Sequence, residues 1–196
     1  MSLTNFLIAL TALCCSPAWS ADDAQALRNP AIDVDAYLRV ASDAMVHRSS
    51  RRLTEAQFVR LSGEPATVVL DARSQEKFDE LHVKGAVNLS FPDIAIGSLE
   101  RLLPDKTTRI LIYCNNNFRH AESAFPLKRS SASLNLFTYV ALYDYGYRNV
   151  YELGPLIDID STVIEFESTG ASVTAATTLD RASPSAALSR LTLAKP

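Results

Sequence analysis

The stretch Arg109-Ile-Leu-Ile-Tyr-Cys114-Asn-Asn-Asn-Phe-Arg119 places a cysteine at the end of an apolar run and an arginine shortly after it. The run 110–113 is bounded by polar residues, which predicts a fully buried strand. Open α/β sheets bind their ligands at the carboxyl ends of the strands, and Cys114 would lie at such an end. The pattern therefore predicts that Cys114 is a nucleophile and that the rest of the chain builds its pocket.

Length and composition restrict the class of protein. At 196 residues, the chain is long enough for one domain with appendages and a substantial core. The hydrophobic share of 47% and the charged share of 21% are ordinary for a globular protein. The formal net charge of −3 argues against nucleic acid as a partner, because binding it normally requires a basic face.

Residues 1–20 have the pattern of a secretory signal peptide. Residues 6–13 form an apolar core that is too short to span a bilayer, and Ala18 and Ser20 are small residues that suit a cleavage site before Ala21. We therefore expect export to the periplasm, with no stable membrane span after cleavage. The alternative is a buried or membrane-anchoring N-terminal helix.

Cleavage would leave the mature chain with a single cysteine. The chain has 3 Cys, and Cys14 and Cys15 lie in the segment that would be removed. Cys114 would then have no partner for an internal disulfide, so it is either a buried hydrophobic residue or a reactive group. Neither His47 nor His120 has the spacing of a metal site, and we expect neither a metal nor a cofactor.

Strand and helix patterns alternate along the chain. Apolar residues at helical spacing predict a helix that starts near Asp33, and capping residues begin further helices at Thr54, Ser74 and Ser98. Apolar, β-branched runs predict strands at 66–70, 109–113 and 149–153, and an amphipathic helix is expected over 134–145. This alternation predicts an α/β fold with parallel strands.

The patterns also divide the chain into segments. After the signal peptide, residues 21–52 form an N-terminal extension with one helix, in which the basic run 48–52 is interpreted as a solvated turn. The α/β domain occupies 53–157, and residues 158–169 are expected to add an edge strand. Residues 170–196 are rich in Ala, Ser and Thr without a sustained period, which predicts a flexible tail.

Four separated segments of the domain carry recognisable motifs. They are the run 68–76 with Asp71 and Arg73, the turn 82–89 with Gly85, the strand that ends in Cys114, and the run 145–154. In this order the segments resemble the rhodanese-like domain, and the chain is most similar to small secreted single-domain bacterial members. The resemblance implies a parallel five-stranded sheet with helices on both faces, and a catalytic cysteine heading a loop between a strand and a helix.

The length of that loop separates two chemistries among similar domains. The resemblance implies six residues, counted from the cysteine, for sulfurtransferases, and seven residues ending in arginine for phosphatases and arsenate reductases. Here Arg119 is the sixth residue, and the seventh, His120, lacks the guanidinium fork that suits phosphate. The loop therefore favours sulfur transfer, with phosphatase or arsenate reductase activity as a weaker alternative.

A reactive thiol is also expected on physical grounds. Backbone N–H groups of a loop that leads to a helix can turn toward an anion and favour the thiolate of Cys114. Asparagine tolerates the positive φ that such a loop requires. Cys114 would take sulfane sulfur from thiosulfate or a related anionic donor and pass it, as a persulfide, to a thiol or cyanide. The predicted donor-binding residues are Asn115, Asn116, Asn117, Phe118 and Arg119.

The segment 120–129 separates this loop from the next helix, whereas similar domains pass almost directly from loop to helix. It could fold over the pocket, with Phe125 as a lid and Lys128 or Arg129 offering charge. It could equally distort the loop and displace the helix. The alternative function is therefore a catalytically inactive rhodanese-like binding module with a protein partner.

Overall fold

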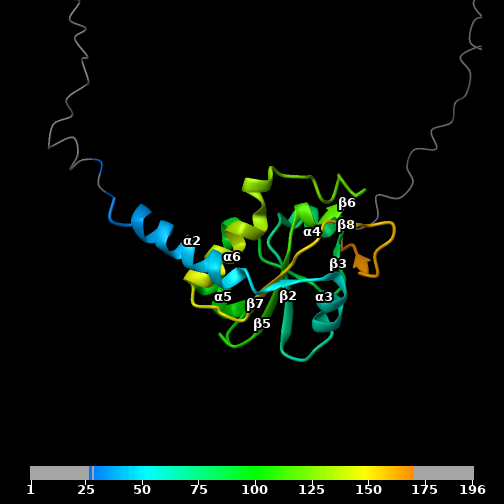
Figure 1. Cartoon of the computed structure of the whole chain (residues 1–196), viewed down its shortest axis with the longest axis horizontal. Helices are drawn as coiled ribbons and strands as arrows, with labels where there is room; N and C mark the ends of the chain where they lie inside the picture. The colour runs from blue at the N-terminus through cyan, green and yellow to red at the C-terminus, as the bar shows by residue number, and fades with distance from the viewer. Residues whose placement is uncertain (1–26, 28, 170–196) are drawn as a thin grey trace, which may run out of the picture. The chain divides into compact units, whose positions relative to one another are not determined.

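The structure is a computed structural model that describes residues 27 and 29–169 (Figure 1). The chain divides into two units, of which the first ends at Leu38 and the second begins at Arg39. The predicted signal peptide at 1–20 and the predicted tail at 170–196 lie outside the described residues. Within the described residues, no helix is both long enough and apolar enough to cross a membrane.

A five-stranded sheet forms the centre of the second unit, with the strand order β1-β7-β5-β2-β4. All of its neighbouring strands pair in parallel, which confirms the predicted parallel five-stranded α/β fold. The strands are β1 (Arg52–Leu53), β2 (Thr67–Asp71), β4 (Val87–Asn88), β5 (Arg109–Tyr113) and β7 (Val150–Leu153).

Helices connect these strands, and local sequence signals start them. Thr54 accepts a hydrogen bond from the backbone N–H of Gln57, whose side chain in turn bonds the backbone of Thr54, so a capping box begins α3. Ser74 begins α4 by accepting a bond from the backbone of Lys77. The helices are α2 (Val34–Arg48), α3 (Glu55–Ser62), α4 (Gln75–Glu80), α5 (Ile96–Leu102) and α6 (Leu134–Asp144).

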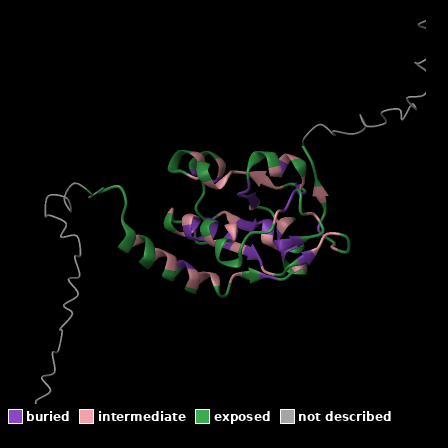
Figure 2. Ribbon diagram, turned by 90° about the horizontal axis from the view of Figure 1, so that it is seen from above, coloured by how far each residue is buried: buried purple, intermediate pink, exposed green. Residues whose placement is uncertain are grey.

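The central strand β5 separates two hydrophobic clusters. Its alternate residues Leu111 and Tyr113 belong to one cluster, together with Phe58 of α3. Ile110 and Ile112 belong to the other cluster, to which α5 and α6 contribute. α3 therefore packs on one face of the sheet and α5 and α6 on the other (Figure 1), and the buried residues gather between these layers (Figure 2). This arrangement fixes the carboxyl end of β5, where Cys114 follows.

Two small sheets lie beside the central one. β6 (Phe118–Arg119) pairs in parallel with β8 (Ile157–Asp158), and β3 (His82–Val83) pairs antiparallel with β9 (Phe166–Glu167). The segment 158–169 thus contains a strand, but that strand joins β3 rather than the edge of the central sheet. Three 3-10 turns complete the described elements: η1 (Phe91–Asp93), η2 (Asn115–Asn117) and η3 (Ser130–Ala132).

Two residues of the segment 120–129, Ala124 and Phe125, pack into the core, while most of the segment stays exposed. Phe125 is fully buried, and its ring centroid lies 4.7 Å from that of Phe118 and 6.0 Å from that of Phe166. The guanidinium of Arg73 stacks over the Phe125 ring at 4.0 Å and donates a hydrogen bond to the carbonyl of Ala124 at 2.7 Å. The interpretation of Phe125 as a lid is therefore wrong, because the ring completes an aromatic cluster under the segment.

A buried polar network holds this region to the sheet. Asp71 accepts hydrogen bonds from Arg73 and from the Tyr113 hydroxyl, the latter at 2.5 Å. Burial, followed by the neighbouring Asp71 carboxylate, raises the pKa of Tyr113 well above its ordinary value. The Tyr113 hydroxyl therefore remains protonated and donates its hydrogen bond to Asp71. Tyr113 is the residue that precedes Cys114 in the sequence.

Candidate functional site

Cys114 lies where the sequence predicted, directly after β5 at the carboxyl end of the sheet. The residue is 1% exposed, and it is the free cysteine of the described residues. Its Sγ accepts a hydrogen bond from the backbone N–H of Asn116 at 3.4 Å and lies 3.4 Å from the Oγ of Ser133. Two polar groups from different parts of the chain thus contact the sulfur.

Ser133 brings the start of a helix to the thiol. It is the N-cap residue of α6, yet its side chain makes no capping hydrogen bond to that helix and contacts Cys114 instead. The N-terminus of a helix carries a partial positive charge that favours an anion. The chain therefore runs from Cys114 through residues 115–133 and then places the N-terminus of α6 beside the same sulfur atom. The segment 120–129 does not move α6 away.

Asn117 fixes the loop after Cys114. Its Oδ1 accepts hydrogen bonds from the backbone N–H of Cys114 at 2.9 Å and from Asn135 Nδ2 at 3.1 Å. Its Nδ2 donates to the carbonyls of Leu153 at 2.8 Å and Pro155 at 3.2 Å. The same side chain therefore links β5, α6 and the end of β7 around the cysteine.

A pocket of about 280 Å³ opens beside Cys114. Its lining is mainly polar and comes from the loop, α6, the end of α2, β1 and β7. The lining residues are Arg48, Arg52, Cys114, Asn116, Asn117, Ser130, Ser133, Asn135, Leu136, Glu152, Leu153 and Gly154. Of the six site residues predicted from the sequence, Cys114, Asn116 and Asn117 thus share the pocket.

Arg48 and Arg52 are the basic residues of the pocket lining. Both donate to Glu152 of β7: Arg48 Nε at 2.7 Å together with its Nη2, and Arg52 Nε at 3.0 Å. The Glu152 side chain is 2% exposed, whereas that of Arg52 is 51% exposed. The interpretation of 48–52 as a solvated turn is wrong for Arg48, which ends α2 and is 21% exposed, whereas Arg52 remains half exposed to solvent. Arg51 lies over the ring of Tyr151.

The remaining predicted site residues lie outside the pocket lining. Asn115 is buried in the turn η2, and Phe118 packs into the aromatic cluster with Phe125. Arg119 is the partner of Asp158 in the parallel pairing of β6 with β8, and its Nη2 forms an ion pair with that carboxylate at 3.1 Å. Arg119 therefore forms an ion pair with Asp158 and does not line the pocket beside Cys114.

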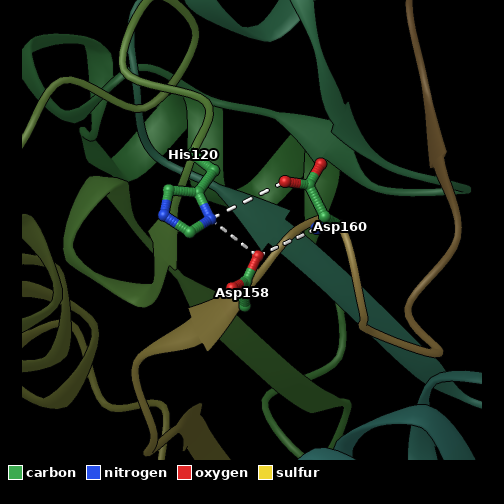
Figure 3. A group of neighbouring side chains, drawn as sticks. All are labelled: His120, Asp158 and Asp160. Atoms are coloured by element: carbon green, nitrogen blue, oxygen red, sulfur yellow. Dashed lines mark hydrogen bonds and ion pairs between the residues drawn. The ribbon is translucent and has the colours of Figure 1, made fainter.

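Asp158, the partner of Arg119, belongs to a small cluster with His120 and Asp160 (Figure 3). His120 Nδ1 donates to Asp158 at 2.9 Å and lies 3.7 Å from Asp160. The hydrogen bond from His120, followed by one from the backbone of Asp160, holds the pKa of Asp158 below its ordinary value. Ligand atoms of the three residues lie within 4.8 Å of one another. Because Arg119 already balances Asp158, the cluster is an ion-pair network that fixes β6 against β8.

The domain matches a known protein family. The family model of the rhodanese-like domain matches residues 54–153. No curated protein matches the sequence significantly. Among solved structures, the rhodanese with anions from E. coli is 18% identical, with 52% of this chain and 98% of that chain covered and a TM-score of 0.36.

Two further solved structures cover more of this chain. A rhodanese-like domain from Anabaena sp. is 21% identical, with 74% of this chain and 97% of that chain covered and a TM-score of 0.44. A thiosulfate sulfurtransferase from Pseudomonas aeruginosa is 14% identical, with 68% of this chain but only 23% of that chain covered and a TM-score of 0.43.

The fold and the site define an α/β protein with a cysteine at the carboxyl end of its central parallel strand. With the family model matching half of its length, the chain belongs to the rhodanese-like domain family.

Proposed function

We propose that this protein is a sulfurtransferase that carries sulfane sulfur on Cys114. The observation that supports the proposal most directly is the setting of the sulfur. A backbone N–H from Asn116 and the N-cap of α6 both contact Sγ, and the adjoining pocket contains two arginines. This setting suits an anionic sulfur donor.

The reaction follows from these contacts in two displacements. The Cys114 thiolate attacks the outer sulfur of the donor, so that a new S–S bond forms while the donor's own S–S bond breaks. With thiosulfate, sulfite leaves with the electron pair. A thiol, as its thiolate, or cyanide then attacks the outer sulfur of the persulfide, and Sγ departs as a thiolate. The Asn116 N–H and the start of α6 stabilise that leaving group.

A second candidate function is a binding module without catalysis. It is favoured by the burial of Cys114, which is 1% exposed, and by the 3-10 turn η2 that follows it. In this case Cys114 packs as a small hydrophobic side chain. The partner would be a protein that binds elsewhere on the domain, and binding would survive replacement of the cysteine.

The intact mass of the protein separates these functions. The full mature chain and its Cys114→Ser variant are incubated with thiosulfate and, in parallel, with inorganic polysulfide, and then weighed. The sulfurtransferase gains the mass of one sulfur atom in the wild type only, and cyanide removes that mass as thiocyanate. A wild-type mass that neither donor changes, with no thiocyanate formed, supports the binding module and contradicts the proposal.

We further propose that the protein acts in the periplasm, on the basis of the apolar run 6–13 and the small residues before Ala21. Fractionation of expressing cells, followed by N-terminal sequencing, tests this location. The mature chain is expected in the periplasmic fraction and should begin at Ala21. An uncleaved chain in the cytoplasmic fraction would contradict the assignment.

A further inference from the structure

The two arginines of the pocket come from a part of the chain that precedes the family match. Arg48 ends α2, and Arg52 lies in β1, whereas the family model begins at residue 54. The parallel pairing of β1 with β7 places Arg52 opposite Glu152. The N-terminal extension therefore adds charged groups to the Cys114 pocket that the matched domain does not contain.

Each guanidinium is held in place and keeps one amino group free. Arg48 uses Nε and Nη2 on Glu152, and Arg52 uses Nε on Glu152 and Nη2 on the carbonyl of Gly154 at 2.9 Å. The Nη1 group of each arginine has no hydrogen-bond partner among the described residues of the chain. Two fixed donors are thus available to a ligand with two oxygens.

The charge of the pocket limits what such a ligand can carry. Among the lining residues, Arg48 and Arg52 are positive, whereas Glu152 and the attacking Cys114 thiolate are negative, so the charges of the lining cancel before a donor binds. The Glu152 carboxylate is buried between the arginines and stays close to any bound anion. A monoanionic donor therefore adds one negative charge to this pocket, whereas a dianionic donor adds two, and the second faces Glu152 without a counter-charge.

We propose that Arg48 and Arg52 form an anion subsite that selects monoanionic organic thiosulfonates over dianionic thiosulfate. The inference rests on the proposed sulfurtransferase function. The two sulfonyl oxygens accept hydrogen bonds from the Nη1 groups, and Leu136 of the lining offers apolar surface to a small organic substituent. Glu152 is a positioning residue, because it acts on the ligand by orienting both guanidinium groups.

The loading step balances for this donor. The Cys114 thiolate attacks the terminal sulfur of the thiosulfonate, the sulfur–sulfur bond of the donor breaks, and a sulfinate leaves with the electron pair. The products are the Cys114 persulfide and one sulfinate monoanion, so two negative charges enter and two remain. The leaving group stays on the subsite with the same charge as the donor, and no oxidant or reductant is needed.

Single-turnover loading of Cys114 tests the subsite. Methanethiosulfonate and thiosulfate are each mixed with the wild type, Arg52→Gln and Arg51→Gln, and persulfide formation is followed by rapid quench and intact mass. We expect the wild type to prefer methanethiosulfonate, and Arg52→Gln to lose about tenfold in second-order rate with it, as for a lost charge-assisted bond. Arg51→Gln is the matched control, because Arg51 lies over Tyr151, and it should stay within about twofold.

Glu152→Gln tests the charge argument separately from folding. This change raises the net charge of the lining by one, so the preference between the two donors should shift toward thiosulfate. A purely structural role of Glu152 would lower both rates together and leave their ratio unchanged. An unchanged ratio, or Arg52→Gln loading that equals Arg51→Gln, would overturn the inference.

Failure of the proposed function is distinguishable from failure of the subsite. If neither donor loads the wild type, the sulfurtransferase proposal fails, and the subsite is then tested by binding alone. Isothermal titration with unreactive methanesulfonate and with sulfate should show tighter binding of methanesulfonate, lost in Arg52→Gln and kept in Arg51→Gln. Equal binding of methanesulfonate by both variants would overturn the subsite.

Discussion

Two basic segments of this protein differ in what they do for Cys114. The loop after the cysteine ends in Arg119, which pairs with Asp158, whereas the segment 48–52 before the family match places Arg48 and Arg52 in the pocket. The loop arginine is near the cysteine in sequence, and the segment 48–52 is far from it. The difference teaches that the charge around the thiol is set by strand pairing rather than by proximity along the chain.

The strand pairings explain why the two segments separate in this way. β6 extends away from the turn η2 and aligns Arg119 with Asp158 of β8. β1 pairs with β7 and aligns Arg52 with Glu152, at the edge of the pocket. Arg119 is therefore held at Asp158 and is absent from the lining of the pocket.

The largest expected effect concerns the loop as a structural element. Asn117→Ala removes four hydrogen bonds and leaves the Cys114 N–H and two carbonyls without their partner. We expect the free energy of unfolding to fall by roughly 2–4 kcal/mol, because unsatisfied buried groups are costly. Urea denaturation measures the change. Asn116→Ala, which releases only bonds to the backbone of Lys128, should cost less than about 1 kcal/mol. Equal losses would show that Asn117 does not anchor the loop.

The next effect concerns the helix end at the thiol. Ser133→Ala removes the hydroxyl that lies 3.4 Å from Sγ. Alkylation of Cys114 by iodoacetamide should slow by about threefold to tenfold, as expected when a thiolate loses one hydrogen bond. Ser130→Ala is the matched control, because Ser130 also lines the pocket but lies at η3, and it should change the rate by less than about twofold. A larger effect of Ser130→Ala would contradict the assigned role of α6.

A smaller effect is expected when the loop arginine itself is changed. Arg119→Gln breaks an ion pair whose arginine side chain is 54% exposed, and it leaves the pocket lining intact. We expect loading of Cys114 to stay within about twofold of the wild type, since exposed ion pairs contribute little. If Arg119→Gln lost as much loading as Arg52→Gln, the two segments would not differ in their contribution to the Cys114 site.

The smallest effect is a pH dependence of the ion-pair network. The pKa of Asp158 is lowered in the folded chain, chiefly by the bond from His120, so its contribution to stability is present above the ordinary carboxyl pKa. That contribution is lost as the pH falls through the lowered value. Between about pH 5 and pH 2, the wild type should therefore lose slightly more stability than Asp158→Asn. Parallel urea midpoints across this range would contradict the assignment.

Most of the fold was predictable because its signals are local. The apolar run of β5 and the caps Thr54 and Ser74 specify their own elements, and the alternation of strands with helices specifies parallel pairing. The position of Cys114 follows from the same rule. Phe125 was misinterpreted because an isolated aromatic residue in a polar segment does not show whether it covers a pocket or fills a core.

The site was predictable only in part because its charges depend on distant pairings. Nothing near Arg52 in the sequence indicates that Glu152 will lie opposite it, and nothing near Arg119 indicates Asp158. The basic run 48–52 could have been associated with the pocket only by predicting the register of β1 against β7. Strand register over such separations is set by the tertiary structure, which the local sequence pattern does not contain.

Protection of Cys114 by an unreactive anion tests the central claim most directly. The rate of alkylation by iodoacetamide is measured with and without methanesulfonate in the wild type, Arg52→Gln and Arg119→Gln. The anion subsite at Arg48 and Arg52 predicts that methanesulfonate slows alkylation in the wild type and in Arg119→Gln, and that this protection is lost in Arg52→Gln. Protection that persists in Arg52→Gln and disappears in Arg119→Gln would contradict the account, because it would return the anion site to the loop.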